Sequence, residues 1–160
     1  MAEYITVSDV NVALNGTIPF NTVSIPCNTG NVIPAAPGVL ILKGNTTGRF
    51  ARYEVRVQGN IAVPTDGEVT PIALAITLDG AVLPESVAIF TPQAVEEYGH
   101  INTVATVTIP CGCCMAVSGT YTDGNLTLRV TDSTLQMFDA NDSLIQGFIF
   151  RCDSVRKVDE

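Results

Sequence analysis

Three of the five cysteines in this 160-residue chain lie in the stretch Cys111-Gly112-Cys113-Cys114, and their thiols are the first candidates for chemistry. A structural zinc site takes four ligands, usually in two pairs spaced as Cys-x-x-Cys. The cluster has shorter spacings, no second pair follows it, and a Cys-x-x-Cys redox motif is absent. Neighbouring side chains of a β-strand point to opposite faces, so Cys113 and Cys114 cannot both face one ion. We therefore expect small, buried, apolar cysteine side chains and no metal or redox centre.

The other two cysteines, Cys27 and Cys152, stand alone in the sequence. The N-terminus has no positive region followed by an apolar block, which predicts synthesis without a secretory signal, in the cytoplasm. Disulfides are rare in that compartment. Two pairings, Cys27–Cys152 and Cys111–Cys113, stay open, but the sequence gives no support to either of them.

The chain has one histidine, His100, which follows Glu96-Glu97-Tyr98-Gly99. A histidine beside carboxylates can act as a general base. Nothing in the sequence places His100 beside a nucleophile, so a solvated loop after a short helical turn is the favoured interpretation. The remaining carboxylates are scattered, as expected of a solvated surface, and those considered for pairing are Glu54, Glu68, Glu85, Glu96 and Glu97.

Two loops resemble known ligand-binding loops only loosely. The stretch 139–143 (Asp-Ala-Asn-Asp-Ser) lacks the fixed Gly and terminal Glu of a calcium-binding EF-hand, and turn chemistry explains it better. The stretch 44–48 lacks the spacing and the Lys-Ser/Thr ending of a phosphate-binding P-loop. We therefore predict no catalytic, cofactor-binding or metal-binding residue, no cofactor and no enzymatic activity.

Composition favours an all-β protein. Val, Thr and Ile make up almost a third of the chain, and β-branched side chains fit a pleated sheet better than a helix. The net charge of −8 and the lack of a basic run argue against nucleic acid as a partner. No apolar stretch is long enough for a transmembrane helix, so membrane insertion is not expected either.

Short strands with period-2 alternation follow one another from residue 38 onward. Arg52–Gln58 alternates strictly, with Tyr53, Val55 and Val57 on one face. Asp79-Gly80 predicts a tight hairpin turn. The other strands expected in this region are 39–42, 72–78, 81–83, 104–109, 115–118, 125–130, 135–138 and 144–151. Two short strands, 18–25 and 31–33, are expected before it. This number and spacing of strands is typical of an antiparallel β-sandwich or jelly roll.

One helical turn is expected near 91–98, with Thr91 as the N-cap and Pro92 as the first helical residue. The irregular stretch 1–37, rich in Pro, Asn and Gly, is interpreted as an N-terminal arm or set of edge strands. Residues 38–152 form the predicted β-sandwich, and 153–160 an acidic C-terminal tail. Four glycosylation-type triplets, at Asn15, Asn45, Asn125 and Asn141, are interpreted as loop chemistry.

Several segments together resemble a known family. They are 23–30 (VSIPCNTG), 51–53 (ARY), 59–65 (GNIAVPT), 69–76 (VTPIALAI), 79–80 (DG), 91–98 (TPQAVEEY) and 109–114 (IPCGCC). Their order and spacing resemble short structural proteins of tailed bacteriophages and prophages of gut Firmicutes, across about residues 10–131. Two features differ: Cys111 stands where the family usually has a basic residue, and the chain continues from Leu135 to Glu160 beyond the family's last strand.

The resemblance implies a jelly roll of the C1q/TNF type, a fold that usually assembles as a trimer. It also implies a virion component, made in the host bacterial cytoplasm, that acts through protein–protein contacts. The expected function is a capsid decoration or head-fibre subunit, with the major capsid protein or other virion proteins as partners. The alternative is a tail or fibre module that binds a host-surface glycan, although the small number of aromatic residues argues against sugar stacking.

Overall fold

The structure, a computed structural model, describes residues 2–27, 30–46 and 48–140. Within these ranges the chain forms twelve strands and a single short 3-10 turn. The elements are β1 (Ala2–Thr6), β2 (Val10–Ala13), β3 (Thr22–Ile25), β4 (Val32–Ala36), β5 (Val39–Lys43), β6 (Phe50–Ala62), β7 (Ile72–Leu78), β8 (Ala81–Val82), η1 (Pro84–Ser86), β9 (Ala88–Phe90), β10 (Gly99–Pro110), β11 (Cys114–Asp123) and β12 (Thr127–Asp139).

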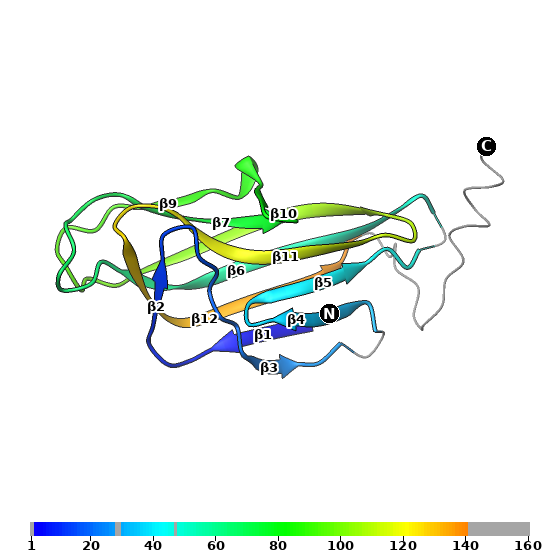
Figure 1. Ribbon diagram of the computed structural model, residues 1–160, viewed down its shortest axis with the longest axis horizontal. Helices are drawn as coiled ribbons and strands as arrows, with labels where there is room; N and C mark the ends of the chain where they lie inside the picture. The colour runs from blue at the N-terminus through cyan, green and yellow to red at the C-terminus, as the bar shows by residue number, and fades with distance from the viewer. Residues whose placement is uncertain (1, 28–29, 47, 141–160) are drawn as a thin grey trace.

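The strands form two antiparallel sheets that face each other as a sandwich (Figure 1). Sheet A has the order β10-β6-β12-β1-β3, and β2 also pairs with β12. Sheet B has the order β4-β5-β11-β7-β8, and β9 also pairs with β7. The neighbours in each sheet are mostly distant in sequence, as in a jelly roll. This architecture confirms the all-β fold class predicted from composition and strand spacing.

The alternation seen in the sequence is realised in the centre of sheet A. Tyr53, Val55 and Val57 of β6 are buried against sheet B, while the intervening polar side chains face outward. Strand β10 pairs with β6 without interruption, from Gly99 opposite Ile61 to Pro110 opposite Phe50. Because register fixes which face each residue occupies, this long pairing determines which side chains face outward as well as which are buried in the core.

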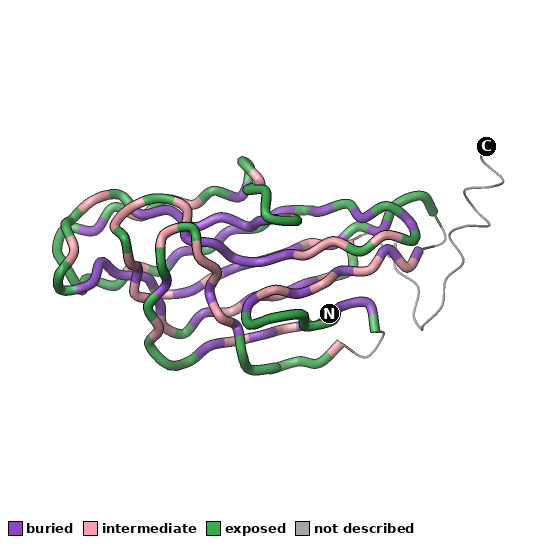
Figure 2. The backbone as a smooth tube through the Cα atoms, in the orientation of Figure 1, coloured by how far each residue is buried: buried purple, intermediate pink, exposed green. Residues whose placement is uncertain are grey.

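The core lies between the sheets, and buried residues follow the central strands (Figure 2). Strand β7 contributes Ile72, Leu74 and Ile76 to this core, and its alternate residues are also buried, on the other face of sheet B. Two tyrosines, Tyr53 and Tyr121, are among the largest fully buried side chains. The hydroxyl of Tyr53 donates to the carbonyl of Lys43 at 2.6 Å, which satisfies a polar group that burial would otherwise penalise.

The cysteine-rich stretch forms the turn between β10 of sheet A and β11 of sheet B, where the chain crosses from one sheet to the other. Strand β10 ends at Pro110, and Gly112 takes the left-handed conformation, with φ of 83°. The amide of Cys113 donates to the carbonyl of Pro110 at 2.9 Å and closes the turn. Strand β11 then begins at Cys114. The prediction that this stretch is a turn between two strands is confirmed.

One strand was predicted as two. Residues 125–130 and 135–138 both belong to β12, which runs from Thr127 to Asp139 without a turn. The register with β6 shifts between Thr131 and Thr134, and Asp132 lies in the left-handed region with φ of 50°. The polar residues that indicated a turn therefore form a β-bulge, in which an extra residue bends a strand that continues beyond it.

The predicted helical turn near 91–98 is absent, and the helical turn that the structure contains is η1, at Pro84–Ser86. Glu96 takes a left-handed φ of 58°, which a right-handed helix does not allow. The Glu97 carboxylate instead accepts hydrogen bonds from the amides of Gln93 and Ala94, at 2.9 and 3.1 Å. These bonds stabilise a loop in the place where Thr91 and Pro92 indicated a helix start.

Three strands were not predicted: β1, β2 and β9. Each is five residues or shorter, which is too short for a period-2 pattern to distinguish a strand from a loop. The strand expected at 144–151 lies outside the described residues. The described part of the chain contains no helix with the length and apolarity that a membrane crossing requires.

Candidate functional site

The cysteines are not all buried, contrary to the prediction. Cys111 is buried, Cys113 and Cys27 are half-buried, and Cys114 is exposed. The difference arises because Cys114 begins β11 directly after the turn between the sheets, where its side chain is exposed to solvent. Among the described residues, no group of three or more His, Cys, Asp or Glu side chains has an arrangement that could hold a metal ion.

The two disulfide pairings left open by the sequence can now be considered. Cys113 is a free thiol, so the Cys111–Cys113 pairing is not formed. Cys111 is nevertheless disulfide-bonded, which differs from the expected inert thiol. The Cys27–Cys152 pairing involves Cys152, which lies outside the described residues.

His100 lies in β10, not in a loop as expected, and its register partner on β6 is Asn60. The ring Nδ1 of His100 lies 3.2 Å from the Asn60 side-chain oxygen, on the exposed face of sheet A. This contact pairs the imidazole with a neutral amide. Of the carboxylates considered, none of Glu54, Glu68, Glu85, Glu96 and Glu97 has a hydrogen bond to His100 among the contacts of the described residues.

Glu96 lies among the loops at the end of the sandwich opposite the cysteine-rich turn. Its amide donates to the carbonyl of Val63 at 2.7 Å, and its carboxylate forms an ion pair with Arg129 of β12. Hydrogen bonds from the Thr65 hydroxyl and from Arg129 lower the pKa of Glu96 below its ordinary value. The arrangement joins three segments of the chain, and it is exposed to solvent, so its role is to position loops.

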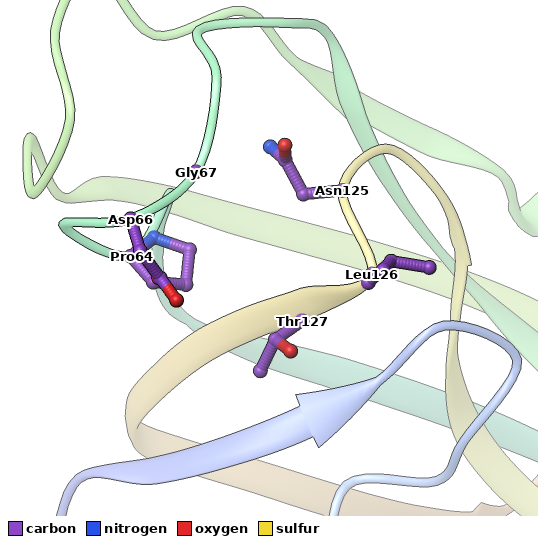
Figure 3. Close-up of a pocket in the computed structure, with 6 residues that line it drawn as sticks. All are labelled: Pro64, Asp66, Gly67, Asn125, Leu126 and Thr127. Carbon is purple, nitrogen blue, oxygen red and sulfur yellow. The ribbon is translucent and has the colours of Figure 1, made fainter.

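The same end of the molecule carries a shallow pocket of about 220 Å³, shown in Figure 3. It lies between the 64–67 loop and the turn before β12, and Asn125, Leu126 and Thr127 line its second side. Leu126 is 83% exposed. The single carboxylate at this pocket is Asp66, so the described residues provide no paired acid and base there.

The outward face of sheet A, called here the sheet A face, has a row of residues across four strands. The row runs through consecutive register partners: Val104 of β10, Arg56 of β6, Gln136 of β12 and Glu3 of β1. The Arg56 guanidinium lies 5.8 Å from the centre of the Phe138 ring and 3.1 Å from the Glu54 carboxylate. The Arg56 Nε is buried and has no hydrogen-bond partner among the described residues.

The outward face of sheet B has a different character, because hydroxyl groups gather on it. Thr77 of β7 and Ser118 of β11 are register partners, and Thr120 lies one outward position further along β11. Their three hydroxyl oxygens form a mutual hydrogen-bonded cluster. They lie at a pocket of about 460 Å³, called here the hydroxyl pocket. The sequence alone does not reveal this cluster, because Thr77 and Ser118 are 41 residues apart and only the pairing of β7 with β11 brings them together.

No protein-family model and no curated protein matches the chain. Solved structures do match it. The globular domain of the zebrafish complement 1qA protein aligns with a TM-score of 0.57 and 10% identity, over 92% of this chain and 98% of that one. Murine APRIL aligns with a TM-score of 0.49 and 7% identity, over 84% of this chain and 98% of that one.

A further match is the Eiger TNF of S. frugiperda, with a TM-score of 0.46 and 11% identity, over 91% of this chain and 96% of that one. The likeness to the zebrafish domain extends over nearly the whole of both chains, at a sequence identity too low to indicate more than fold. The expectation of fold drawn from the sequence resemblance is thereby confirmed. The chain is a C1q/TNF-like jelly roll.

Proposed function

We propose that this protein is a non-catalytic module that assembles as a homotrimer through the sheet A face, and that it serves as a capsid decoration or head-fibre subunit of a bacteriophage virion. The C1q/TNF-like fold supports the first part, because domains of this fold typically form homotrimers. The second part rests on the sequence resemblance to phage structural proteins. Under this proposal the chain acts by contact with copies of itself and with other virion proteins.

The observation that carries the trimer is the environment of Arg56. A buried donor without a partner is uncommon in a folded protein, and each instance calls for a group that satisfies it. Arg56 lies on the outward face of sheet A, where its side chain is 39% exposed although the Nε atom itself is covered by its own chain. A carbonyl or carboxylate from a second copy that packs on this face would pair with the part of the Arg56 side chain that stays exposed.

Apolar side chains accompany Arg56 on this face and at its border. Val104 is exposed on β10 and Phe50 at the start of β6, while Val87 and Ile89 are exposed at the neighbouring edge of sheet B. An edge that packs on a neighbour's face makes a head-to-tail contact, and three such contacts close a ring. Burial of these side chains would give the ring its favourable free energy.

The net charge of −8 is compatible with the virion role, because an acidic decoration or fibre protein would not compete for the nucleic acid of the particle. The chain would be found in the virion after synthesis in the bacterial host. Mass spectrometry of purified virions tests this directly. Many copies per particle support a capsid decoration and a few copies a fibre, whereas absence from the particle contradicts the virion role.

Light scattering of interface variants tests the trimer. Phe138→Glu and Val104→Arg place a charge on the sheet A face, and both should shift the mass from that of a trimer to that of a monomer. Leu126→Asp is the matched control, because it adds a charge at an exposed apolar residue of the distant loops and should leave the mass unchanged. A trimeric mass for both interface variants would contradict assembly through this face.

A further inference from the structure

We propose that the hydroxyl pocket on the outward face of sheet B is a binding site for a neutral sugar residue, held by Thr77, Ser118 and Thr120. The site does not depend on the trimer. The trimer contacts proposed above use the sheet A face and the edge of sheet B at Val87 and Ile89, and none of these residues lines the hydroxyl pocket, so the trimer can form while the pocket stays open. The proposal gives a specific location to a glycan-binding role.

Strand alternation explains why these hydroxyl groups meet. On β11, Val117 and Tyr121 face the core, which turns Ser118 and Thr120 outward. On β7, Ile76 faces the core and Thr77 turns outward. Two small residues, Gly80 and Ala116, also line the pocket beside the hydroxyl groups.

The three hydroxyl groups lie deep in the pocket. Thr77 is 5% exposed, and Ser118 and Thr120 are each 7% exposed. The oxygen of Thr77 is hydrogen-bonded to that of Ser118 and lies 3.3 Å from that of Thr120. The oxygens of Ser118 and Thr120 are 3.4 Å apart.

This arrangement leaves hydrogen-bond acceptors unused. Each hydroxyl group has one hydrogen and two lone pairs. The Thr77 hydroxyl also lies 3.4 Å from the main-chain oxygen of Ser118, and the three hydrogens can supply at most three bonds in all, so at least three of the six lone pairs are left. The remaining lone pairs can accept hydrogen bonds, so the pocket floor matches a ligand that offers several donors close together.

The walls of the pocket are fixed by main-chain hydrogen bonds. On one side, Asn15 and Thr17 line the pocket, and their segment is bound to β11 by the bonds Asn15 N to Tyr121 O at 2.7 Å and Tyr121 N to Gly16 O at 3.0 Å. On the other side, the β7–β8 turn is bound to β11 through Asp79. Its amide donates to Ala116 O, and its carboxylate accepts from Ala116 N, both at 2.7 Å. A pocket held in this way needs little ordering when a ligand binds.

The lining identifies the class of ligand. No charged side chain is found among the described residues that line the pocket, which argues against phosphate, sialic acid or an ammonium group. Val39 and Val82 add apolar walls. A pyranose ring has hydroxyl donors on its rim and C–H groups on its faces, and it is smaller than the 460 Å³ pocket, which falls in the usual range for small-molecule sites.

The same chemistry occurs in a free sugar and in a sugar unit of a cell-surface polysaccharide. No aromatic ring lines the pocket among the described residues, so a single sugar should bind weakly. Three copies on one particle would increase the apparent affinity for a polysaccharide, since a second binding event becomes intramolecular. A polysaccharide is therefore the physiological source that this geometry favours.

Two-dimensional NMR of the amide groups of the full chain tests the site. The probes are the methyl pyranosides of glucose, galactose, mannose and N-acetylglucosamine, followed by oligosaccharides of whichever sugar binds. The expected result is a saturable shift of the amide signals of residues 15–17, 77–82 and 116–120. Stronger binding of the oligosaccharide than of the monosaccharide identifies a polysaccharide, and equal binding identifies a free sugar. Failure of all four sugars to shift these signals would overturn the proposal.

Variants of the pocket residues distinguish a specific site from weak, nonspecific binding at the surface. Ser118→Ala and Thr120→Val each remove one hydroxyl group and should weaken binding about fivefold, the usual effect of one neutral hydrogen bond. Ser24→Ala, on the exposed strand β3, is the matched control and should bind as the unchanged protein does. Unchanged affinity in both pocket variants, with unfolding transitions that show they are folded, would contradict the assignment. The mass of each sample is measured in parallel, so a loss of trimer is distinguished from a loss of the sugar site.

Discussion

The side-chain amide of Asn125 forms both hydrogen bonds of a β-bridge with the main chain of Glu68. Its nitrogen donates to the Glu68 carbonyl at 2.8 Å, and its oxygen accepts from the Glu68 amide at 3.0 Å. The residues are 57 positions apart, and their contact joins the turn before β12 to the loop before β7. This glycosylation-type triplet therefore has a structural use, as the interpretation of loop chemistry expected.

Replacement of Asn125 by Leu should lower the free energy of unfolding by about 1–2 kcal/mol, because two exposed hydrogen bonds are lost. Asn125→Asp keeps an acceptor for the Glu68 amide but loses the donor. We expect the free energy of unfolding of Asn125→Asp, measured by chemical denaturation, to lie between those of Asn125→Leu and the unchanged protein. Equal stability for all three proteins would show that the bridge contributes nothing.

The Ser86 hydroxyl is a hydrogen-bond partner for the main chain of β7. Its hydroxyl oxygen accepts from the Ile76 amide at 2.8 Å, and its hydrogen donates to Leu83 O at 2.7 Å. Ser86 is fully buried, so Ser86→Ala leaves the Ile76 amide without a partner and should cost about 1–3 kcal/mol of stability. Ser24→Ala, at an exposed position, is the control and should be near neutral. A Ser86 variant as stable as the control would contradict this role.

The Glu96 carboxyl should make stability depend on pH. Its folded pKa lies below the ordinary value of 4.5, with the Thr65 hydrogen bond as the largest cause and Arg129 as the next. The stabilisation is therefore present above pH 4.5 and is lost as the pH falls through the lowered value. We expect the difference in unfolding free energy between the unchanged protein and Glu96→Gln to be constant at neutral pH and to shrink in acid. A difference that grows in acid would contradict the assignment.

The thiols should differ in reactivity. Cys114 is exposed and Cys113 is half-buried, so iodoacetamide should modify Cys114 first under native conditions, as read by peptide mapping. In a Cys114→Ser variant the rapid phase of modification should disappear. Faster modification of Cys113 than of Cys114 would contradict the exposure of Cys114 at the start of β11.

The parts of the fold that sequence could predict are those with local causes. The alternation of Arg52–Gln58, the turn at Gly112 and the hairpin at Asp79-Gly80 follow from side-chain period and from residues that favour turns. The bulge at Asp132 could not be predicted, because a turn and a bulge require the same residue types and only the pairing with β6 distinguishes them. The helical turn at 91–98 was wrong because the Glu97 carboxylate binds the local amides in a non-helical loop.

The candidate sites, like the fold, depend partly on local sequence and partly on strand pairing that the sequence does not show. The sequence predicted no catalytic or metal-binding set, and it did not indicate that Glu54 and Glu96 form ion pairs with Arg56 and Arg129. The sequence also did not reveal the hydroxyl pocket or the sheet A face. Thr77 meets Ser118, and Arg56 meets Phe138, through strand pairings that join distant parts of the chain. The alternation of the strands predicts which residues point outward, but not which of them are neighbours.

The most direct test of the central claim is the mass of the unchanged protein in solution, measured by native mass spectrometry or sedimentation at low micromolar concentration. Each chain has a mass of 16.9 kDa, so a homotrimer built through the sheet A face has a mass of about 51 kDa. We predict a single species at that mass. A stable species at the mass of one chain would contradict the account.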